Sequence, residues 1–257
     1  MIVYKTQEEI ELIRQSAQIL GKAHAEVAKM IQPGVSTIAL DKRAEEFIRD
    51  NKGKPSFKGY NSFPASLCIS VNDAVVHGIP DKYELKEGDI ISIDCGVFLN
   101  GFHSDSAYTY PIGEVSADIR KLLKVTKESL DIGIQHALAG SRVGDISYSI
   151  QKHVEKNGFS VIRELVGHGV GRSLHESPEV PNFGKRGRGA KLKEGLVIAI
   201  EPMVNLGKRN VVQSNDGWTI KTSDRSPSAH YEHTVAINNG KCDVLTTFEY
   251  IEEVFKI

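Results

Sequence analysis

The feature that most constrains the fold is the dipeptide Asn100-Gly101, which lies between two runs of alternating apolar and polar residues, 89–99 and 102–110. Asn-Gly favours a two-residue β-turn, because both central positions of that turn require positive φ. Such a turn places Leu99 opposite Phe102 and thereby determines every later pair of the two strands. The sequence therefore predicts a long antiparallel β-hairpin over these residues.

Two acidic residues share one face of this predicted hairpin. Side chains alternate along a strand, so Asp94 and Asp105 become diagonal neighbours beside the small residues Gly96 and Ala107. The opposite face is apolar and carries Ile91, Ile93, Cys95, Val97 and Leu99. Two close carboxylates repel each other unless a proton or a cation lies between them. The hairpin alone leaves two interpretations open, solvated strand acids or metal ligands, and a three-residue loop would destroy the geometry.

Periodicity and turn residues predict the remaining elements. We expect helices from the capping box Thr6-x-x-Glu9 to about Pro33-Gly34, from Leu40 to near Asn51 and Gly53, from Ser116 to about Ala139, and from Ile146 to Asn157-Gly158. We expect strands over Leu67–Val71, Gly195–Val204 and Tyr231–Ile237, with a second hairpin turn at Asn239-Gly240.

The order of these elements repeats within the chain. Two helices followed by strands and an Asn-Gly turn occur twice, and residues 33–53 loosely resemble residues 140–158. The prediction is an α/β (α+β) fold in which two similar halves meet around one central cleft. With 257 residues we expect a single domain over residues 1–257.

Composition excludes several classes of protein. Lys and Arg number 32 against 33 Asp and Glu, so no global positive field exists to hold nucleic acid or an anionic membrane. Residues 1–12 contain no apolar run and predict neither a secretory signal nor a membrane span. The 3 cysteines are widely spaced, without a Cys-x-x-Cys pair, which is typical of reduced thiols. We expect a cytoplasmic protein.

Three further residues are candidates for a site, each with an ordinary alternative. Glu201 lies in the apolar run 196–203, where an unpaired charge would cost several kcal/mol, although an arginine partner would also satisfy it. Glu232 lies at the start of the last β-run, where a solvated edge acid is the favoured explanation for this residue taken alone. His168 lies in the glycine-rich segment 167–171, which allows close approach to a ligand, but a lone loop histidine is often structural.

Together these residues form a set of two aspartates, two glutamates and one histidine. Oxygen ligands with a single imidazole suit Mn²⁺, Fe²⁺, Co²⁺ or Zn²⁺, and four carboxylates can neutralise two divalent ions. Such a pair of ions is typical of hydrolases that activate a bridging water. The sequence lacks the G-x-S-x-G, H-E-x-x-H and Walker patterns of other hydrolases and phosphate-binding proteins.

Five stretches, in order along nearly the whole chain, resemble type I methionine aminopeptidases. They are residues 67–80, Asp94 with Asp105, residues 167–175, residues 200–202 and residues 231–234. The resemblance implies the pita-bread fold, in which two pseudo-symmetric α/β halves enclose a dinuclear metal site. It also implies that Asp94 chelates one ion, that Asp105 and Glu232 bridge both, and that His168 and Glu201 hold the other. Glu201 is, in addition, the family's candidate general base.

The resemblance further implies a set of substrate contacts. His77 and His175 would lie near the scissile amide nitrogen and the carbonyl oxygen or its oxyanion. The methionine pocket would contain Tyr60, Phe63, Cys68, Leu174 and Trp218, for which core packing is the alternative explanation. Leu165 and Leu174 stand where aromatic residues are common in relatives. His230 is expected to be an exposed histidine, with an outer contact to the metal site as the alternative.

The expected function is removal of the initiator methionine from nascent polypeptides whose second residue is small. The alternatives are an Xaa-Pro aminopeptidase of the same fold and a non-catalytic pita-bread protein that binds peptides or ribosomes. We expect a monomer without membrane contact. The basic loop 185–193 predicts either a solvated surface or a weak contact with ribosomal RNA.

Overall fold

The computed structural model describes residues 1–238 and 240–255. Its α-helices are α1 (Gln7–Ala28), α2 (Thr37–Asp50), α3 (Ala117–Gln135), α4 (Val143–Lys156) and α5 (Glu249–Val254), with a short 3₁₀ turn at Tyr60–Ser62. Strands of the first half are β1 (Lys54–Pro55), β2 (Leu67–Val71), β3 (Ala74–Val76), β4 (Ile90–Leu99) and β5 (Phe102–Pro111). Those of the second half are β6 (Ser160–Val161), β7 (Val166–Gly169), β8 (Glu176–Pro181), β9 (Val197–Ile200), β10 (Met203–Asn205), β11 (Val211–Gln213), β12 (Ile220–Thr222), β13 (Ser228–His230), β14 (His233–Asn238) and β15 (Lys241–Val244).

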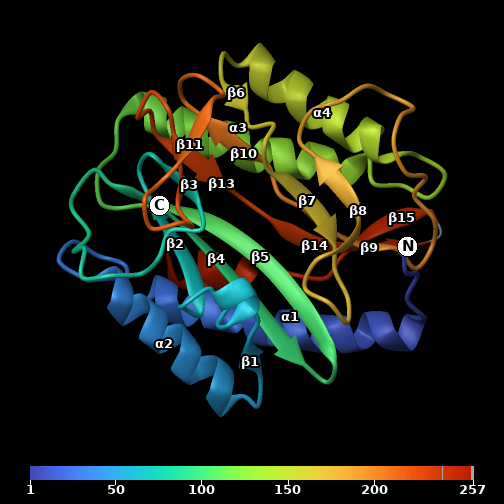
Figure 1. The fold of residues 1–257 in the computed structure, drawn as a ribbon, viewed down its shortest axis with the longest axis horizontal. Coiled ribbons are helices and arrows are strands. Elements are labelled where there is room, and N and C mark those ends of the chain that lie inside the picture. Colours follow the sequence, from blue (N-terminus) through green and yellow to red (C-terminus); the bar gives the residue numbers. More distant parts are fainter. Residues whose placement is uncertain (239, 256–257) are drawn as a thin grey trace.

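The strands form the middle of the molecule, between two pairs of helices. In Figure 1, α1 and α2 cover one side of the strands while α3 and α4 cover the other. A four-stranded sheet contains β1, β2, β4 and β5, and a five-stranded sheet has the order β15-β14-β9-β7-β8. Two smaller sheets have the orders β13-β10-β6 and β11-β12-β3. None of the described helices combines the length and apolar character that a membrane crossing requires.

The predicted hairpin and its register are confirmed. Leu99 pairs with Phe102, Asp94 with Ala107, and Gly96 with Asp105. Asn100 and Gly101 both have positive φ, 52° and 85°, as the two-residue turn requires. On the apolar face of β4, Ile91, Ile93, Cys95 and Val97 are buried and Leu99 beside the turn is half-buried. The two aspartates therefore do share the opposite face.

The first helix begins as predicted and ends earlier. The Thr6 hydroxyl accepts from the Glu9 amide at 3.2 Å, and the Glu9 carboxylate accepts from the Thr6 amide at 3.1 Å, which completes the capping box. The helix ends at Ala28 rather than near Pro33-Gly34. Pro33 has no N–H to continue the helical pattern, and the Gly34 amide donates instead to the Leu85 carbonyl at 2.8 Å.

The two halves repeat one construction. Helices α2 and α4 both have 14 residues. Each follows a glycine with positive φ, Gly34 or Gly140, whose amide donates to the carbonyl of Leu85 or Leu192 at 2.8 or 2.9 Å. Each of these leucines begins the sequence Leu-Lys-Glu-Gly and leads into a central strand. The predicted pseudo-symmetry is confirmed, and it gives Asp94 and Glu201 the same place in the two halves.

Two strands that we expected to be continuous are broken. The run 195–204 forms β9 and β10, which belong to different sheets and are separated by Glu201-Pro202. Pro202 has no N–H, so it cannot donate to a continuing ladder. The run 231–237 likewise contains only β14, because Tyr231 and Glu232 separate it from β13. The predicted turn at Asn239-Gly240 is framed by the pair Asn238 and Lys241, while Asn239 lies outside the described residues.

Side chains connect the two halves along β5 and the segment 230–234. The Asp105 amide donates to the Thr234 hydroxyl at 3.0 Å, and this hydroxyl donates to the Asp105 carbonyl at 2.7 Å. The Glu232 amide donates to the Ala107 carbonyl at 2.9 Å. The hydroxyl of Ser106 donates to the Glu232 carbonyl at 2.9 Å. These bonds hold the acidic residues of the two halves next to one another.

Candidate metal centre and adjoining cavity

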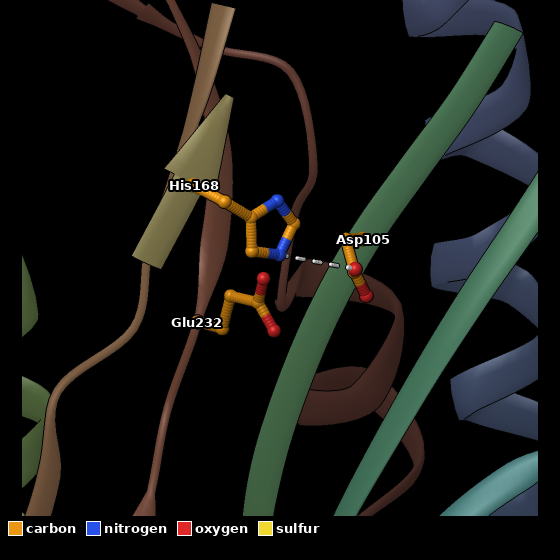
Figure 2. Close-up of side chains that lie close together, drawn as sticks. All are labelled: Asp105, His168 and Glu232. Atoms are coloured by element: carbon orange, nitrogen blue, oxygen red, sulfur yellow. Dashed lines mark ion pairs between the residues drawn. The ribbon is translucent and has the colours of Figure 1, made fainter. Parts of the chain in front are cut away.

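Four carboxylates and one imidazole converge between the halves. Asp94 and Asp105 project from the hairpin, whereas Glu201 and Glu232 lie at the two strand breaks. Figure 2 shows Asp105, His168 and Glu232 facing one another, and one ligand atom from each lies within 4.8 Å of the other two. His168 Nε2 is 3.8 Å from Asp105 Oδ2 and 3.6 Å from Glu201 Oε1.

The orientation of His168 leaves one ring nitrogen free for a ligand. Its Nδ1 lies 2.9 Å from the Gly169 carbonyl, which can only accept, so Nδ1 carries the proton and Nε2 holds the lone pair. The flanking glycines allow the strand to approach its neighbours. A Cβ at Gly167 would lie 2.4 Å from the Ala199 carbonyl oxygen, and one at Gly169 would lie 2.6 Å from the Ser177 carbonyl oxygen. The glycine-rich segment thus serves close packing around the histidine.

The electrostatics of the cluster favour a bound cation. Burial, with a smaller effect of neighbouring carboxylates, raises the pKa of Asp105, Glu201 and Glu232 well above the usual range. Burial also raises the pKa of Asp94 to about 7. Buried oxygens of Asp94 and Asp105 have no hydrogen-bond partner among the described residues. Carboxylates that are buried together and only partly satisfied are the oxygen-rich set that divalent cations bind.

The arginine partner considered for Glu201 is not found in the described part of the chain. Its two carboxylate oxygens face imidazoles instead, since Oε2 lies 3.7 Å from Nε2 of His230. The expectation that His230 is exposed is wrong, because this residue is only 1% exposed. Burial lowers the pKa of His230 to about 3, so its ring is neutral. His230 is the last residue of β13, where it pairs with Met203, and its side chain faces Glu201.

One cavity of about 540 Å³ adjoins the cluster. Its lining includes every residue predicted for the site, namely Tyr60, Phe63, Cys68, His77, Asp94, Asp105, His168, Leu174, His175, Glu201, Trp218 and Glu232. It also includes Phe57, Val76 and Met203, which the sequence did not single out. Val76 lies within the stretch 67–80, directly before His77, and Met203 directly follows the stretch 200–202. These positions were the only signal in the sequence that could have identified the two residues.

One end of the cavity is lined by apolar side chains. Phe57, Phe63, Cys68 and Leu174 belong to one buried cluster, and Tyr60 and Trp218 pack against it. The rings of Phe63 and Trp218 meet edge to face with centroids 5.1 Å apart. Burial raises the pKa of the Cys68 thiol, so this residue stays neutral. The lining suits an apolar side chain of a ligand.

Two imidazoles line the cavity beside this apolar end. His175 is exposed, its Nδ1 lies 2.8 Å from the Tyr60 hydroxyl, and its ring centroid is 4.1 Å from that of His168. His77 has a positive φ of 59°, a strained conformation for a non-glycine residue, and its ring meets Trp218 edge to face. Burial lowers the pKa of both histidines. Both rings are therefore neutral near pH 7 and able to donate one hydrogen bond.

The basic loop 185–193 has a fixed backbone and exposed cationic side chains. The amides of Val143 and Gly144 donate to the carbonyls of Ala190 and Arg188 at 3.0 and 2.9 Å. Arg186 lies over the Tyr148 ring, 4.8 Å from its centroid. The loop therefore presents an exposed, positively charged surface.

Comparison with known proteins gives a family match over most of the chain. The model of metallopeptidase family M24 matches residues 11–239. A methionine aminopeptidase of Clostridium perfringens is 54% identical over 246 residues, which cover 96% of this chain and 99% of that protein. The crystal structure of methionine aminopeptidase from Thermotoga maritima is 44% identical, with a TM-score of 0.95, and covers 96% of this chain and 100% of that one.

A more distant structural match concerns the alternative enzyme. Prolidase from Pyrococcus furiosus has a TM-score of 0.80 at 24% identity, and the match covers 96% of this chain but 66% of that one. At this identity the likeness shows a shared fold alone. The fold comparisons confirm the expected pita-bread arrangement, and the sequence identities favour the methionine-specific branch over the proline-specific one.

Proposed function

The chain belongs to the methionine aminopeptidases of metallopeptidase family M24, and we propose that it hydrolyses the first peptide bond of polypeptides that begin with methionine. The observation that carries the proposal is the continuity of the cavity, in which a buried carboxylate cluster adjoins an apolar end. Such a cavity suits a substrate with a reacting amide and an apolar side chain. The family preference for a small second residue is part of the proposal.

Divalent metal use follows from the family, and the donor set fits it. We propose that the centre binds two ions among Mn²⁺, Fe²⁺, Co²⁺ and Zn²⁺. The residues that would hold them are Asp94, Asp105, His168, Glu201 and Glu232. When bound, such ions acidify a water molecule and polarise the carbonyl that it attacks.

The chain's own side chains would bind and orient the substrate. The methionine side chain would occupy the cavity end formed by Tyr60, Phe63, Cys68, Leu174 and Trp218. His175 and His77 are neutral donors beside that end, so His175 would contact the carbonyl oxygen or oxyanion and His77 the scissile amide nitrogen. Glu201 would accept the water proton and pass it on, since its buried carboxyl has a raised pKa.

The decisive experiment measures free methionine released from Met-Ala-Ser by chelator-stripped protein, with each of the four metals and without metal. An Ala-Pro-containing peptide is the matched substrate control. Metal-dependent release from Met-Ala-Ser alone supports the proposal. Cleavage of the proline peptide instead would establish the Xaa-Pro aminopeptidase, and cleavage of neither peptide with any metal would favour the non-catalytic binding protein.

The natural substrate, location and assembly are further parts of this proposal. We propose that the protein acts in the cytoplasm, as a monomeric single domain, on nascent chains.

Replacing Lys185, Arg186 and Arg188 with glutamate tests whether the basic loop contributes a weak ribosome contact. Unchanged co-sedimentation with ribosomes would leave the loop as a solvated surface. Sedimentation equilibrium and a single cooperative unfolding transition test the monomer and the single domain.

A further inference from the structure

A lysine near the start of the chain forms an unusually buried ion pair. Lys5 Nζ lies 2.6 Å from Glu176 Oε2, and the two side chains are 2% and 10% exposed. In every other Lys or Arg ion pair among the described residues, the basic side chain is at least 28% exposed. A surface pair contributes little, but breaking a buried pair leaves an uncompensated charge. Glu176 directly follows His175.

The surrounding backbone is shaped around this pair. The Lys5 amide donates to the Gly195 carbonyl at 2.7 Å, which ties the segment before α1 to the second half of the molecule. The Glu176 carboxylate also accepts from the Ser173 amide at 3.2 Å. A Cβ at Gly171 would lie 2.3 Å from Glu176 Oε1 and 2.6 Å from Lys5 Cε. Any side chain at position 171 would therefore collide with the Lys5–Glu176 pair, so the pair requires a glycine there.

A second contact holds the other part of the same loop. Arg172 Nη2 lies 2.9 Å from Oε1 of Glu9, the residue that completes the α1 capping box. The Arg172 guanidinium lies over the Phe102 ring, 4.5 Å from its centroid. The His103 amide donates to the Gly171 carbonyl at 2.8 Å. The loop 171–176 is thus attached to the beginning of the chain at Arg172 and again at Glu176.

We propose that Lys5 is a positioning residue, which through Glu176 holds the His175 imidazole in its place beside the carboxylate cluster. Lys5 is absent from the cavity lining, whereas Glu176 and His175 are part of it. Loss of the lysine charge leaves a buried carboxylate without its partner, so the loop must move to hydrate it. A displacement of about 1 Å in a catalytic group can reduce the rate about 100-fold. The inference rests on the proposed function, in which His175 contacts the substrate.

The test compares Lys5→Met in two backgrounds, the wild-type protein and His175→Ala. In metal-loaded wild-type protein, we expect Lys5→Met to lower kcat for Met-Ala-Ser about 10- to 100-fold with little change in KM. In the His175→Ala background, the same substitution should lower the residual kcat less than about twofold, because its effect acts through the missing imidazole. Glu176→Gln, which keeps the side-chain shape, should show the same dependence on His175.

Arg14→Met is the matched control. Arg14 forms an equally short ion pair with Asp243, 2.6 Å, but both side chains are partly exposed and neither is part of the cavity lining. It should leave kcat unchanged. Equal kcat losses from Lys5→Met in both backgrounds, or no loss in the wild type, would overturn the inference.

Amide hydrogen exchange at Ser173 separates this inference from the proposed function. Exchange should accelerate in Lys5→Met and in Glu176→Gln, because the loop is released whether or not the protein is an enzyme. Accelerated exchange in a protein that releases no methionine would count against the proposed function. It would still support the inference that the Lys5–Glu176 ion pair holds the loop 171–176 in place. Unchanged exchange together with unchanged kcat would show that the Lys5–Glu176 ion pair does not hold the loop.

Discussion

The two halves of the molecule supply acids to one centre by different constructions. In the first half, Asp94 and Asp105 lie within an unbroken hairpin whose pairing register sets the face on which they lie, although the Asp105 amide and carbonyl bond to the Thr234 hydroxyl of the second half. In the second half, Glu201 and Glu232 lie where the chain leaves one sheet for another. The repeated Leu-Lys-Glu-Gly sequence leads to both central strands, and the halves diverge only after it, where Pro202 occupies the place of Cys95.

The difference shows that the acids of the second half, which lie between strands, depend on hydrogen bonds outside their own ladders for their placement. The Glu232 backbone is bonded to Ala107 and Ser106 of the first half at 2.9 Å in each case. The Glu201 carbonyl accepts from Asn182 Nδ2 at 2.9 Å. A strand break frees the acid from the alternation of a ladder and lets it turn toward the hairpin. The same freedom makes these specific bonds necessary.

The largest expected effect comes from removing one acid of each half. If both halves contribute equally to the centre, Asp105→Asn and Glu201→Gln should each lower kcat/KM by at least about 1,000-fold, the equivalent of about 4 kcal/mol. Bound metal, measured by elemental analysis after dialysis, should fall in both. Glu253→Gln, on the exposed side of α5, is the control and should retain activity and metal. Full activity in either of the two acid variants would show that the two halves do not contribute equally to the centre.

Metal removal should make stability depend on pH. When folding raises the pKa of a carboxyl group, the native chain binds that proton more tightly than the unfolded chain does. The resulting contribution to the free energy of unfolding is present at low pH and is lost as the pH rises from the unfolded pKa to the folded pKa. For Asp94 this window extends from 3.8 to about 7, and the pKa values of Asp105, Glu201 and Glu232 are also raised. We expect chelated protein to lose at least about 5 °C in Tm, relative to metal-loaded protein, between pH 5 and pH 8.

Calorimetry of the two forms side by side measures this difference. Buried histidines outside the centre, such as His24 and His233, have lowered pKa values and act in the opposite direction, but they do so in both forms. Subtracting the two Tm profiles therefore isolates the carboxylate cluster. Parallel profiles would show that the four acids are not the groups that bind metal.

Sequence patterns predicted the first half of the centre better than the second. The turn Asn100-Gly101 determines the hairpin register, so the shared face of Asp94 and Asp105 followed from local rules alone. Glu201 and Glu232 have unusual positions in the sequence. That they lie close to each other is a feature of tertiary structure, because it depends on the strand breaks and on hydrogen bonds between segments that are distant in the sequence. Their roles came from the family resemblance.

The residues that were missed share a physical reason. The sequence predicts an exposed His230, but its backbone bonds to the Thr109 hydroxyl of the first half and its side chain is buried facing Glu201. Lys5 and Glu176 are separated by 171 positions and belong to no motif, so no periodicity relates them. Burial of a polar side chain by a distant segment is a property of packing, which local patterns do not contain.

A smaller effect should follow from loosening one strand break. Asn182→Leu keeps the approximate volume but leaves the Glu201 carbonyl without its donor, so we expect kcat to fall about 10-fold. Thr126→Ala is the matched control, because it removes a buried hydroxyl that donates to the Leu122 carbonyl at 2.8 Å within α3. Both variants should lose some thermal stability, but only Asn182→Leu should lose activity. Equal kcat values would show that Pro202 and the flanking strands suffice to hold Glu201.

The smallest expected effect compares two histidines that each precede an acid of the centre by two residues. His103 precedes Asp105, and its Nδ1 lies 2.9 Å from the Ser56 hydroxyl. His230 precedes Glu232 and instead faces Glu201, at 3.7 Å. His230→Gln retains a donor toward Glu201, so kcat should fall about threefold, less than the 10- to 100-fold typical of losing an outer partner of a metal ligand.

His103→Gln should leave kcat unchanged, because its ring is directed to Ser56 and Phe98 rather than to the carboxylates. Steady-state kinetics at saturating metal, together with metal titrations of both variants, measure the comparison. An unaffected His230→Gln would mean that Glu201 is held by His168 and its backbone alone. A loss in His103→Gln as large as in His230→Gln would mean that the two halves support their acids more symmetrically than their strand breaks indicate.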